Sequence, residues 1–177
     1  WLMIPPKSGA ALVDLHVHDA DFVRYLLGEP QSVDSVGTAK KGGWEYVFTQ
    51  YVYPNIAVSA EGGWNMPPGF PFCMSYRAVF EKGTLDFSTA KSPSLALYPA
   101  AGGVEHPALP KPQVSAASAG GNISDLGGYY NEIRYFVDCI LKGVEPKVVT
   151  PEDAAASVAL IEREIKSAEK KLGKKSR

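Results

Sequence analysis

The sequence predicts an α+β domain in which helices pack on one face of an open, largely antiparallel β-sheet. Three observations predict it. A helical pattern opens the 177-residue chain, a long stretch rich in β-branched and aromatic residues follows, and two further helical patterns close it. Because the strands follow one another and the helices lie at the two ends, this order favours an α+β domain over alternating βα units.

The first predicted helix runs from Ala10 to Leu27. Ser8 precedes it as a candidate cap, and Gly28 and Pro30 end it. About 18 residues without Gly or Pro lie between these signals, and such a length is typical of a helix rather than a strand.

The middle of the chain predicts six strands. Short turns that contain Gly or Pro separate them, which favours antiparallel neighbours. The expected strands cover residues 32–40, 44–53, 56–64, 72–81, 84–88 and 94–98.

The second of these strands is apolar on both faces. Alternation places Trp44, Tyr46, Phe48 and Val52 on one face, and it places Val47, Tyr51 and Tyr53 on the other. A strand of this kind usually has both faces covered. Helices of this chain can cover one face. The other face needs a second copy of the chain or another domain, and we expect a homo-oligomer through this face.

An irregular stretch and two helices complete the prediction. Residues 99–122 are rich in Ala, Gly, Pro and Ser and are expected to be irregular. One helix is expected from Leu126 to Lys142, ending at Gly143. The last begins at Pro151, with Thr150 as its N-cap, and runs to about residue 172.

Composition excludes several classes of function. The net charge of −1 gives no general electrostatic reason to bind nucleic acid or an anionic membrane. No apolar run approaches the roughly 20 residues that span a bilayer. Cys73 and Cys139 lie far apart and are expected to be free thiols in a reducing, cytoplasmic compartment. The chain begins with Trp1, and we expect it to be a piece of a longer protein.

A polar stripe on the first predicted helix is the strongest functional signal. At about 100° per residue, Asp14, His18, Asp21 and Tyr25 fall within roughly 60° of one another. Asp14 and His18 are four residues apart, so their side chains can meet on one face. A carboxylate beside an imidazole suits an acid/base that moves a proton to or from a hydroxyl. The same stripe is also compatible with a hydrogen-bonded network in the core.

A metal site is the alternative interpretation of the segment from Asp14 to His18. Asp14-x-His16-x-His18 resembles the metal-binding opening of amidohydrolases and related phosphoesterases, in which residues two apart on a strand point the same way. Such sites need further ligands, and His106 is the only other histidine downstream. We therefore expect no metal.

Four segments, taken in order, carry a resemblance to a known family. They are Ser8–Pro30, with its Asp, its His four residues later and its Leu-Gly-Glu-Pro end; Glu81–Phe87, with a Gly-containing turn; Tyr130-x-Glu132-x-x-x-Phe136 with Gly143 and Pro146; and Pro151 through Ser167. Together they resemble the C-terminal domain of the glucose–fructose oxidoreductase/inositol dehydrogenase (Gfo/Idh/MocA) family.

The resemblance implies a catalytic role for two residues. His18 would exchange the proton of the substrate hydroxyl, and Asp14 would bind or orient that substrate, while hydride passes to NAD or NADP. Asp21 and Tyr25 share their face and are candidate substrate-binding residues. The expected substrate is a sugar, a polyol such as inositol, or a related hydroxy compound.

Two parts of the family pattern are missing from this chain. The G-x-G-x-x-G dinucleotide fingerprint is absent, and so is a Glu-Lys-Pro motif whose Lys completes the active site. Both belong to the N-terminal Rossmann domain. Residues 1–177 are therefore expected to form a single substrate-binding and oligomerisation domain, inactive alone and with no cofactor bound. The alternative is a non-catalytic binding or oligomerisation module with the same fold.

Overall fold

The computed structural model describes residues 1, 4–40, 42–109 and 127–172. These residues form helices and two open, antiparallel, three-stranded sheets, which confirms the predicted fold class. The strands thus form two sheets instead of one. The chain divides into two compact units, Trp1–Pro68 with Lys147–Arg177, and Gly69–Pro146.

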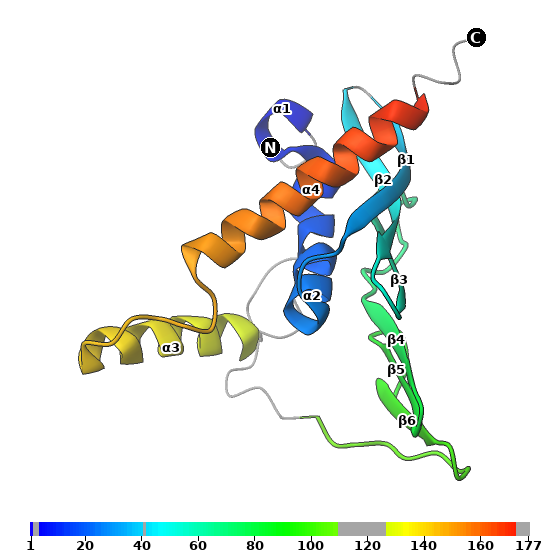
Figure 1. The fold of residues 1–177 in the computed structure, drawn as a ribbon, viewed down its shortest axis with the longest axis vertical. Coiled ribbons are helices and arrows are strands. Elements are labelled where there is room, and N and C mark those ends of the chain that lie inside the picture. Colours follow the sequence, from blue (N-terminus) through cyan, green and yellow to red (C-terminus); the bar gives the residue numbers. More distant parts are fainter. Residues whose placement is uncertain (2–3, 41, 110–126, 173–177) are drawn as a thin grey trace. The chain divides into compact units, whose positions relative to one another are not determined.

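The first unit consists of helices on one face of a sheet (Figure 1). Its strands lie in the order β1-β2-β3, and all neighbours are antiparallel. The helical segments η1, α2 and α4 contact one another as well as the sheet. The elements are α1 (Pro5–Ser8), the π-helical turn η1 (Leu12–His16), α2 (Val17–Leu27), β1 (Ser32–Lys40), β2 (Gly43–Val52), β3 (Ala57–Gly63) and α4 (Pro151–Leu172).

Two helix ends, at Gly28 and Thr150, lie where the sequence predicts them, whereas Ser8 is the last residue of α1. The Ser8 hydroxyl accepts a hydrogen bond from the backbone N–H of Ala10 at 3.0 Å. Gly28 ends α2 with a φ of 75°, a conformation that glycine adopts without strain. At the start of α4, the Thr150 hydroxyl accepts from the backbone N–H of Asp153, and the Asp153 carboxylate accepts from the backbone N–H of Thr150. This reciprocal pair is a capping box.

The core lies between the helices and the inner face of the sheet. It draws on four elements, so burial of apolar surface fixes α4 and the first helix against β2. Its buried members are Leu12, Ala20, Val23, Trp44, Val47, Tyr51, Leu160, Ile161 and Ala168.

A β-bulge changes which way Trp44 faces. Thr38 pairs with Tyr46, but the next residue, Ala39, pairs with Trp44, so Glu45 is an extra residue in β2. An extra residue inverts the alternation of side chains. The prediction that Trp44 shares a face with Phe48 and Val52 was therefore wrong: Trp44 is 9% exposed and belongs to the core.

The outer face of this sheet remains apolar, as predicted. Val36 and Phe48 are directly opposite each other on β1 and β2, and both are exposed, as is Val52. Val47 and Tyr51 share the inner face, as their predicted common face requires, and both belong to the core.

The second unit contains the other sheet and one helix. Its strands pair in the order β4-β5-β6, and the predicted Gly-containing turn joins the first two. Rings of Tyr76 and Phe87 stack across β4 and β5 with their centroids 5.3 Å apart. The elements are β4 (Ser75–Phe80), β5 (Gly83–Ser88), β6 (Leu95–Pro99) and α3 (Gly127–Lys142).

Part of the predicted irregular stretch, and the predicted first residue of the penultimate helix, Leu126, lie outside the described residues. The described end of that helix is at Lys142, followed by Gly143 with a φ of 62°. Of the helices that the structure describes, none is long and apolar enough to cross a membrane.

The bulge predicts unequal costs for two aromatic truncations on the same strand. Trp44→Ala should lower the free energy of unfolding by about 3–5 kcal/mol, because it empties a packed core position. Phe48→Ala should cost about 1 kcal/mol or less, because its ring is 40% exposed. Urea denaturation of both variants measures the two costs. Equal losses would contradict the inverted alternation.

Candidate functional site

The four residues of the predicted polar stripe lie along η1 and α2. His18, Asp21 and Tyr25 are exposed on α2, and Tyr25 is 76% exposed. Asp14 lies on η1 and is half-buried. The helical spacing thus places an imidazole, a carboxylate and a phenol on the outer side of α2, away from the core residues Ala20 and Val23.

The structure does not bond these residues to one another. No hydrogen bond or ion pair joins Asp14 to His18, although both are described. Asp21 instead accepts a short hydrogen bond from the Ser157 hydroxyl on α4. Arg24 also donates to that hydroxyl, at 2.7 Å. Asp21 therefore ties α2 to α4 through Ser157, in addition to any role toward a ligand.

The exposed side of α2 is more apolar than a solvated helix face usually is. Phe22 is 41% exposed and Leu26 is 57% exposed, beside the polar groups His18 and Tyr25. A mixed face of this kind fits a surface that a ligand or another domain covers.

A second histidine, His16, is buried completely and occupies the centre of a polar network. Its Nδ1 lies 3.0 Å from the Asp19 carboxylate. Its Nε2 lies 3.0 Å from the Glu164 carboxylate, and Glu164 is also fully buried. An imidazole that faces a carboxylate at each ring nitrogen can donate a hydrogen bond to both only in its protonated form.

Hydroxyl groups donate to both carboxylate oxygens of Glu164. Tyr51 donates to Oε1 and Thr49 donates to Oε2, each at 2.8 Å. Because the Thr49 proton is used in this way, Ser35 donates to the Thr49 oxygen, also at 2.8 Å. Five elements therefore contribute to one network: η1, α2, α4, β1 and β2.

The network shifts the pKa values of its members. Burial by itself lowers the pKa of His16, but the hydrogen bonds to Asp19 and Glu164 raise it to about 9. His16 is therefore an imidazolium at neutral pH. Burial and the Glu164 charge raise the pKa of the Tyr51 phenol well above its ordinary value, so the phenol keeps its proton.

The network was not predicted from the sequence, although α4 carries a signal for it. Leu160, Ile161 and Ala168 form the buried face of α4, and Glu164 occupies the same face at helical spacing. A carboxylate on an apolar helical face needs a buried partner. On a helix, His16 also points away from the exposed His18, toward the core. These two observations together could have suggested the pair.

The π-helical turn lies immediately before the exposed site. It spans Leu12–His16 and takes one more residue per hydrogen-bonded turn than an α-helix. Such turns occur often at functional sites. The whole segment is helical, so Asp14, His16 and His18 do not share one face as they would on a strand. The described residues hold no group of three or more His, Cys, Asp or Glu side chains that could bind a metal ion.

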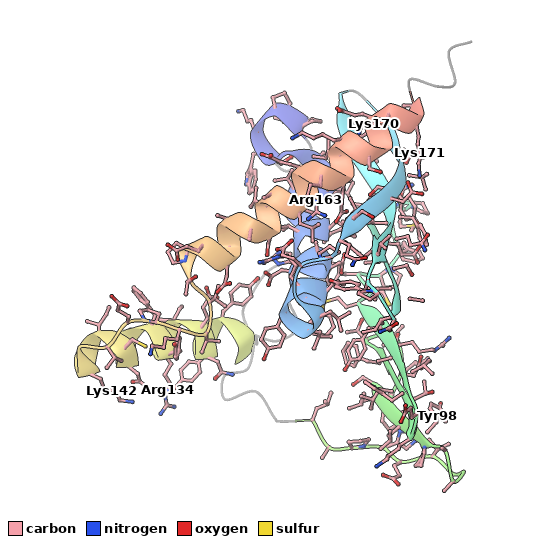
Figure 2. The ribbon with its side chains drawn as sticks, viewed as in Figure 1. Tyr98, Arg134, Lys142, Arg163, Lys170 and Lys171 are labelled. Carbon is pink, nitrogen blue, oxygen red and sulfur yellow. The ribbon has the colours of Figure 1, made fainter. Side chains whose placement is uncertain are left out.

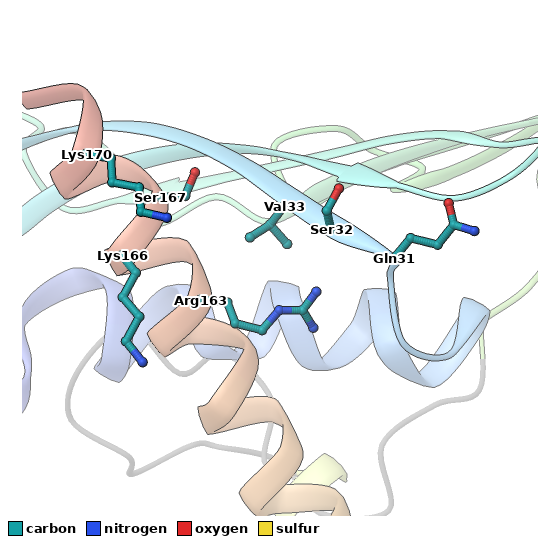
Figure 3. Close-up of a pocket in the computed structure, with 7 residues that line it drawn as sticks. All are labelled: Gln31, Ser32, Val33, Arg163, Lys166, Ser167 and Lys170. Carbon is teal, nitrogen blue, oxygen red and sulfur yellow. The ribbon is translucent and has the colours of Figure 1, made fainter. Parts of the chain in front are cut away.

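A shallow groove of about 370 Å³ lies elsewhere in the first unit, between α4 and the start of β1 (Figure 3). Arg163 and Lys170, two of its cationic residues, follow α4 toward Lys171 (Figure 2). The groove contains none of the four predicted site residues and no carboxylate. The lining residues are Gln31, Ser32, Val33, Arg163, Lys166, Ser167 and Lys170.

Comparison with known proteins supports the resemblance seen in the sequence. The model of the GFO/IDH/MocA C-terminal domain family matches residues 1–86, which include η1, α2 and the first sheet. This confirms the resemblance of that part of the chain. No curated protein sequence matches the chain significantly.

Solved structures share the fold at low sequence identity. An oxidoreductase from Agrobacterium radiobacter, in complex with NAD+, L-tartaric acid and magnesium, has a TM-score of 0.69 at 16% identity, over 90% of this chain and 47% of its own. A levoglucosan dehydrogenase with NADH and levoglucosan has a TM-score of 0.67 at 21% identity, over 91% of this chain and 48% of its own. The same dehydrogenase with NADH and L-sorbose gives 0.69. The chain spans about half the length of these structures.

The buried imidazolium predicts a pH dependence of stability. The His16 pKa is higher in the folded chain than its ordinary value of 6.5, so its contribution is fully present below pH 6.5 and is lost as the pH rises toward 9. Chemical denaturation across this range should show the free energy of unfolding falling by roughly 1–3 kcal/mol.

Glu164→Gln should lower the stability at pH 6.5 by about 2–4 kcal/mol and reduce the further loss toward pH 9, because it removes one of the charges that hold the proton. The exposed Glu162→Gln is the matched control and should resemble the wild type. A wild-type stability that does not change between pH 6.5 and 9 would contradict the buried ion pair.

Proposed function

We propose that this chain, whose residues 1–86 match the GFO/IDH/MocA C-terminal domain, is the substrate-side domain of an NAD(P)-dependent oxidoreductase. The substrate is a sugar, a polyol or a related hydroxy compound. Catalysis requires a nucleotide-binding domain in the same protein, and this chain is inactive alone. The fold supports the proposal, since it corresponds to about half of each oxidoreductase structure compared above.

Oxidation of an alcohol needs two acceptors. The nicotinamide ring accepts the hydride, and a base accepts the hydroxyl proton. His18 is the candidate base, because imidazole is the side chain best suited to proton transfer near neutral pH. Asp14, one turn earlier, would bind or orient the reacting hydroxyl. Asp21 and Tyr25 offer a carboxylate and a phenol to the other hydroxyls of such a substrate.

One observation carries the proposal most directly. His18 is exposed on α2, while His16, two residues earlier, is fixed in the core. The two histidines therefore have different roles, and His18 is available to a ligand. The exposed Phe22 and Leu26 beside it fit a face that the nucleotide-binding domain and the substrate cover together.

The second candidate function is a non-catalytic binding or oligomerisation module. The exposed outer face of the first sheet favours it, because Val36, Phe48 and Val52 would remain in water in a monomer. The two functions are distinguished by whether His18 matters for turnover. A domain that acts only in assembly would tolerate its loss.

His18→Ala should lower kcat by about 100-fold or more in the gene product that includes the nucleotide-binding domain, which is the usual cost of losing an acid/base. Asp14→Asn should cost less, because it keeps the shape of the side chain. Turnover is followed as NADH or NADPH absorbance, with levoglucosan, L-sorbose and L-tartrate as the first substrates. His106→Ala, which removes an exposed histidine of the second unit, is the control. Unchanged turnover in His18→Ala would refute the proposal.

We also propose that the chain self-associates through the outer face of the first sheet. Sedimentation of the wild type should show an oligomer, and Phe48→Asp should shift it toward monomer by placing a charge in that face. Val79→Asp, at a 76% exposed position in the second unit, is the matched control. A wild type that is monomeric at high concentration would contradict this self-association.

A further inference from the structure

We propose that His16 and Glu164 are positioning residues. Their buried ion pair holds η1 and α2 in the one arrangement that presents His18 to the substrate. Neither residue can touch a ligand, because both are completely buried. The inference rests on the proposed role of His18, and it assigns a function to a network that the proposed chemistry does not itself use.

The pair lies at the junction between the π-helical turn and the helix that carries the exposed site. His16 is the last residue of η1, and His18 is the second residue of α2. The extra residue in a π-turn rotates the residues after it by about 100° relative to the residues before it. If η1 relaxed to an α-helix, the side chain of either Asp14 or His18 would point in a different direction.

The ion pair prevents this relaxation. A rotation of that size in the residues from His16 onward would withdraw the imidazole from Glu164, which belongs to another helix, and would leave the Glu164 carboxylate buried without a counter-charge. Separating a buried pair in this way is strongly destabilising. The π-turn and the pair therefore stabilise each other.

The pair is also enclosed by every element packed against it. Asp19 faces it from α2, Glu164 from α4, and the Tyr51 and Thr49 hydroxyls from β2. On β3, a Cβ at Gly62 would lie 2.9 Å from both His16 Nδ1 and Asp19 Oδ2. Gly62 of β3 thus packs closely against His16 and Asp19, where a larger residue would not fit without a shift.

The charges of the pair select one arrangement of the helices more than they raise the free energy of unfolding. A buried ion pair contributes little to stability compared with apolar side chains of the same size, and its best-attested use is to specify one arrangement. Here one imidazolium serves two carboxylates, those of Asp19 and Glu164. When His16 loses its proton, one ring nitrogen faces a carboxylate without a hydrogen to donate. One of the hydrogen bonds that hold α2 in place is then lost, and turnover should decline as the pH approaches 9.

The test compares variants in the gene product that includes the nucleotide-binding domain, with NAD+ or NADP+ and the substrate of highest turnover among levoglucosan, L-sorbose and L-tartrate. Glu164→Gln should lower kcat by roughly 10- to 100-fold with little change in KM, because a misplaced base slows proton transfer. It should also move the alkaline decline of kcat to lower pH. Glu162→Gln should match the wild type in both.

Circular dichroism establishes that each variant is folded. If Glu164→Gln is unfolded, Glu164→Asp replaces it, because this variant keeps the charge and shortens the side chain. It should lower kcat while the alkaline decline stays near that of the wild type. A folded Glu164 variant with wild-type kcat and pH profile would overturn the inference and leave the proposed function intact. Wild-type turnover in His18→Ala would instead overturn the proposed function.

Discussion

The ion pair between His16 and Glu164 is the contact on which the arrangement of the first unit depends. It joins η1 to α4 through the middle of the core, and Tyr51 and Thr49 connect it to β2. The side chains of His16, Glu164, Tyr51 and Thr49 are shielded from water, so each must keep its partner. Few arrangements of two helices on a sheet satisfy all of these groups at once, and the network therefore selects one.

This constraint separates two histidines that are neighbours in the sequence. His16 is a cation held in the core, and His18 remains exposed on the opposite side of the helix. An interior that is fixed by hydrogen bonds can support a surface group whose position must be exact. In the proposed oxidoreductase, this half of the protein would supply the proton acceptor, and the nucleotide-binding half would supply the hydride acceptor.

Local signals in the sequence predicted most of the fold. Gly28 and Thr150 marked helix ends correctly, because capping depends on residues close together in the chain. The six strands appeared close to their expected positions, since turns and alternation are also local. Helical spacing placed His18 and Tyr25 on one face of the helix, but it did not decide whether that face is buried; both are exposed.

Long-range and irregular features could not be predicted in the same way. The π-turn and the bulge at Glu45 each add one residue to a regular repeat, and the inward turn of Trp44 results from the bulge. Periodicity assumes that no residue is added. The pairing of His16 with Glu164 joins opposite ends of the chain, and a single sequence shows only that each needs a partner.

Nitrogen-15 NMR of the histidine side chains tests the buried ion pair most directly. At pH 7.5 both ring nitrogens of His16 should carry a proton, because carboxylates lie 3.0 Å from each and hold its pKa at about 9. In Glu164→Gln at the same pH, the fraction of protonated His16 should fall. A neutral His16 in the wild type, with one ring nitrogen unprotonated at pH 7.5, would contradict the central role of the pair.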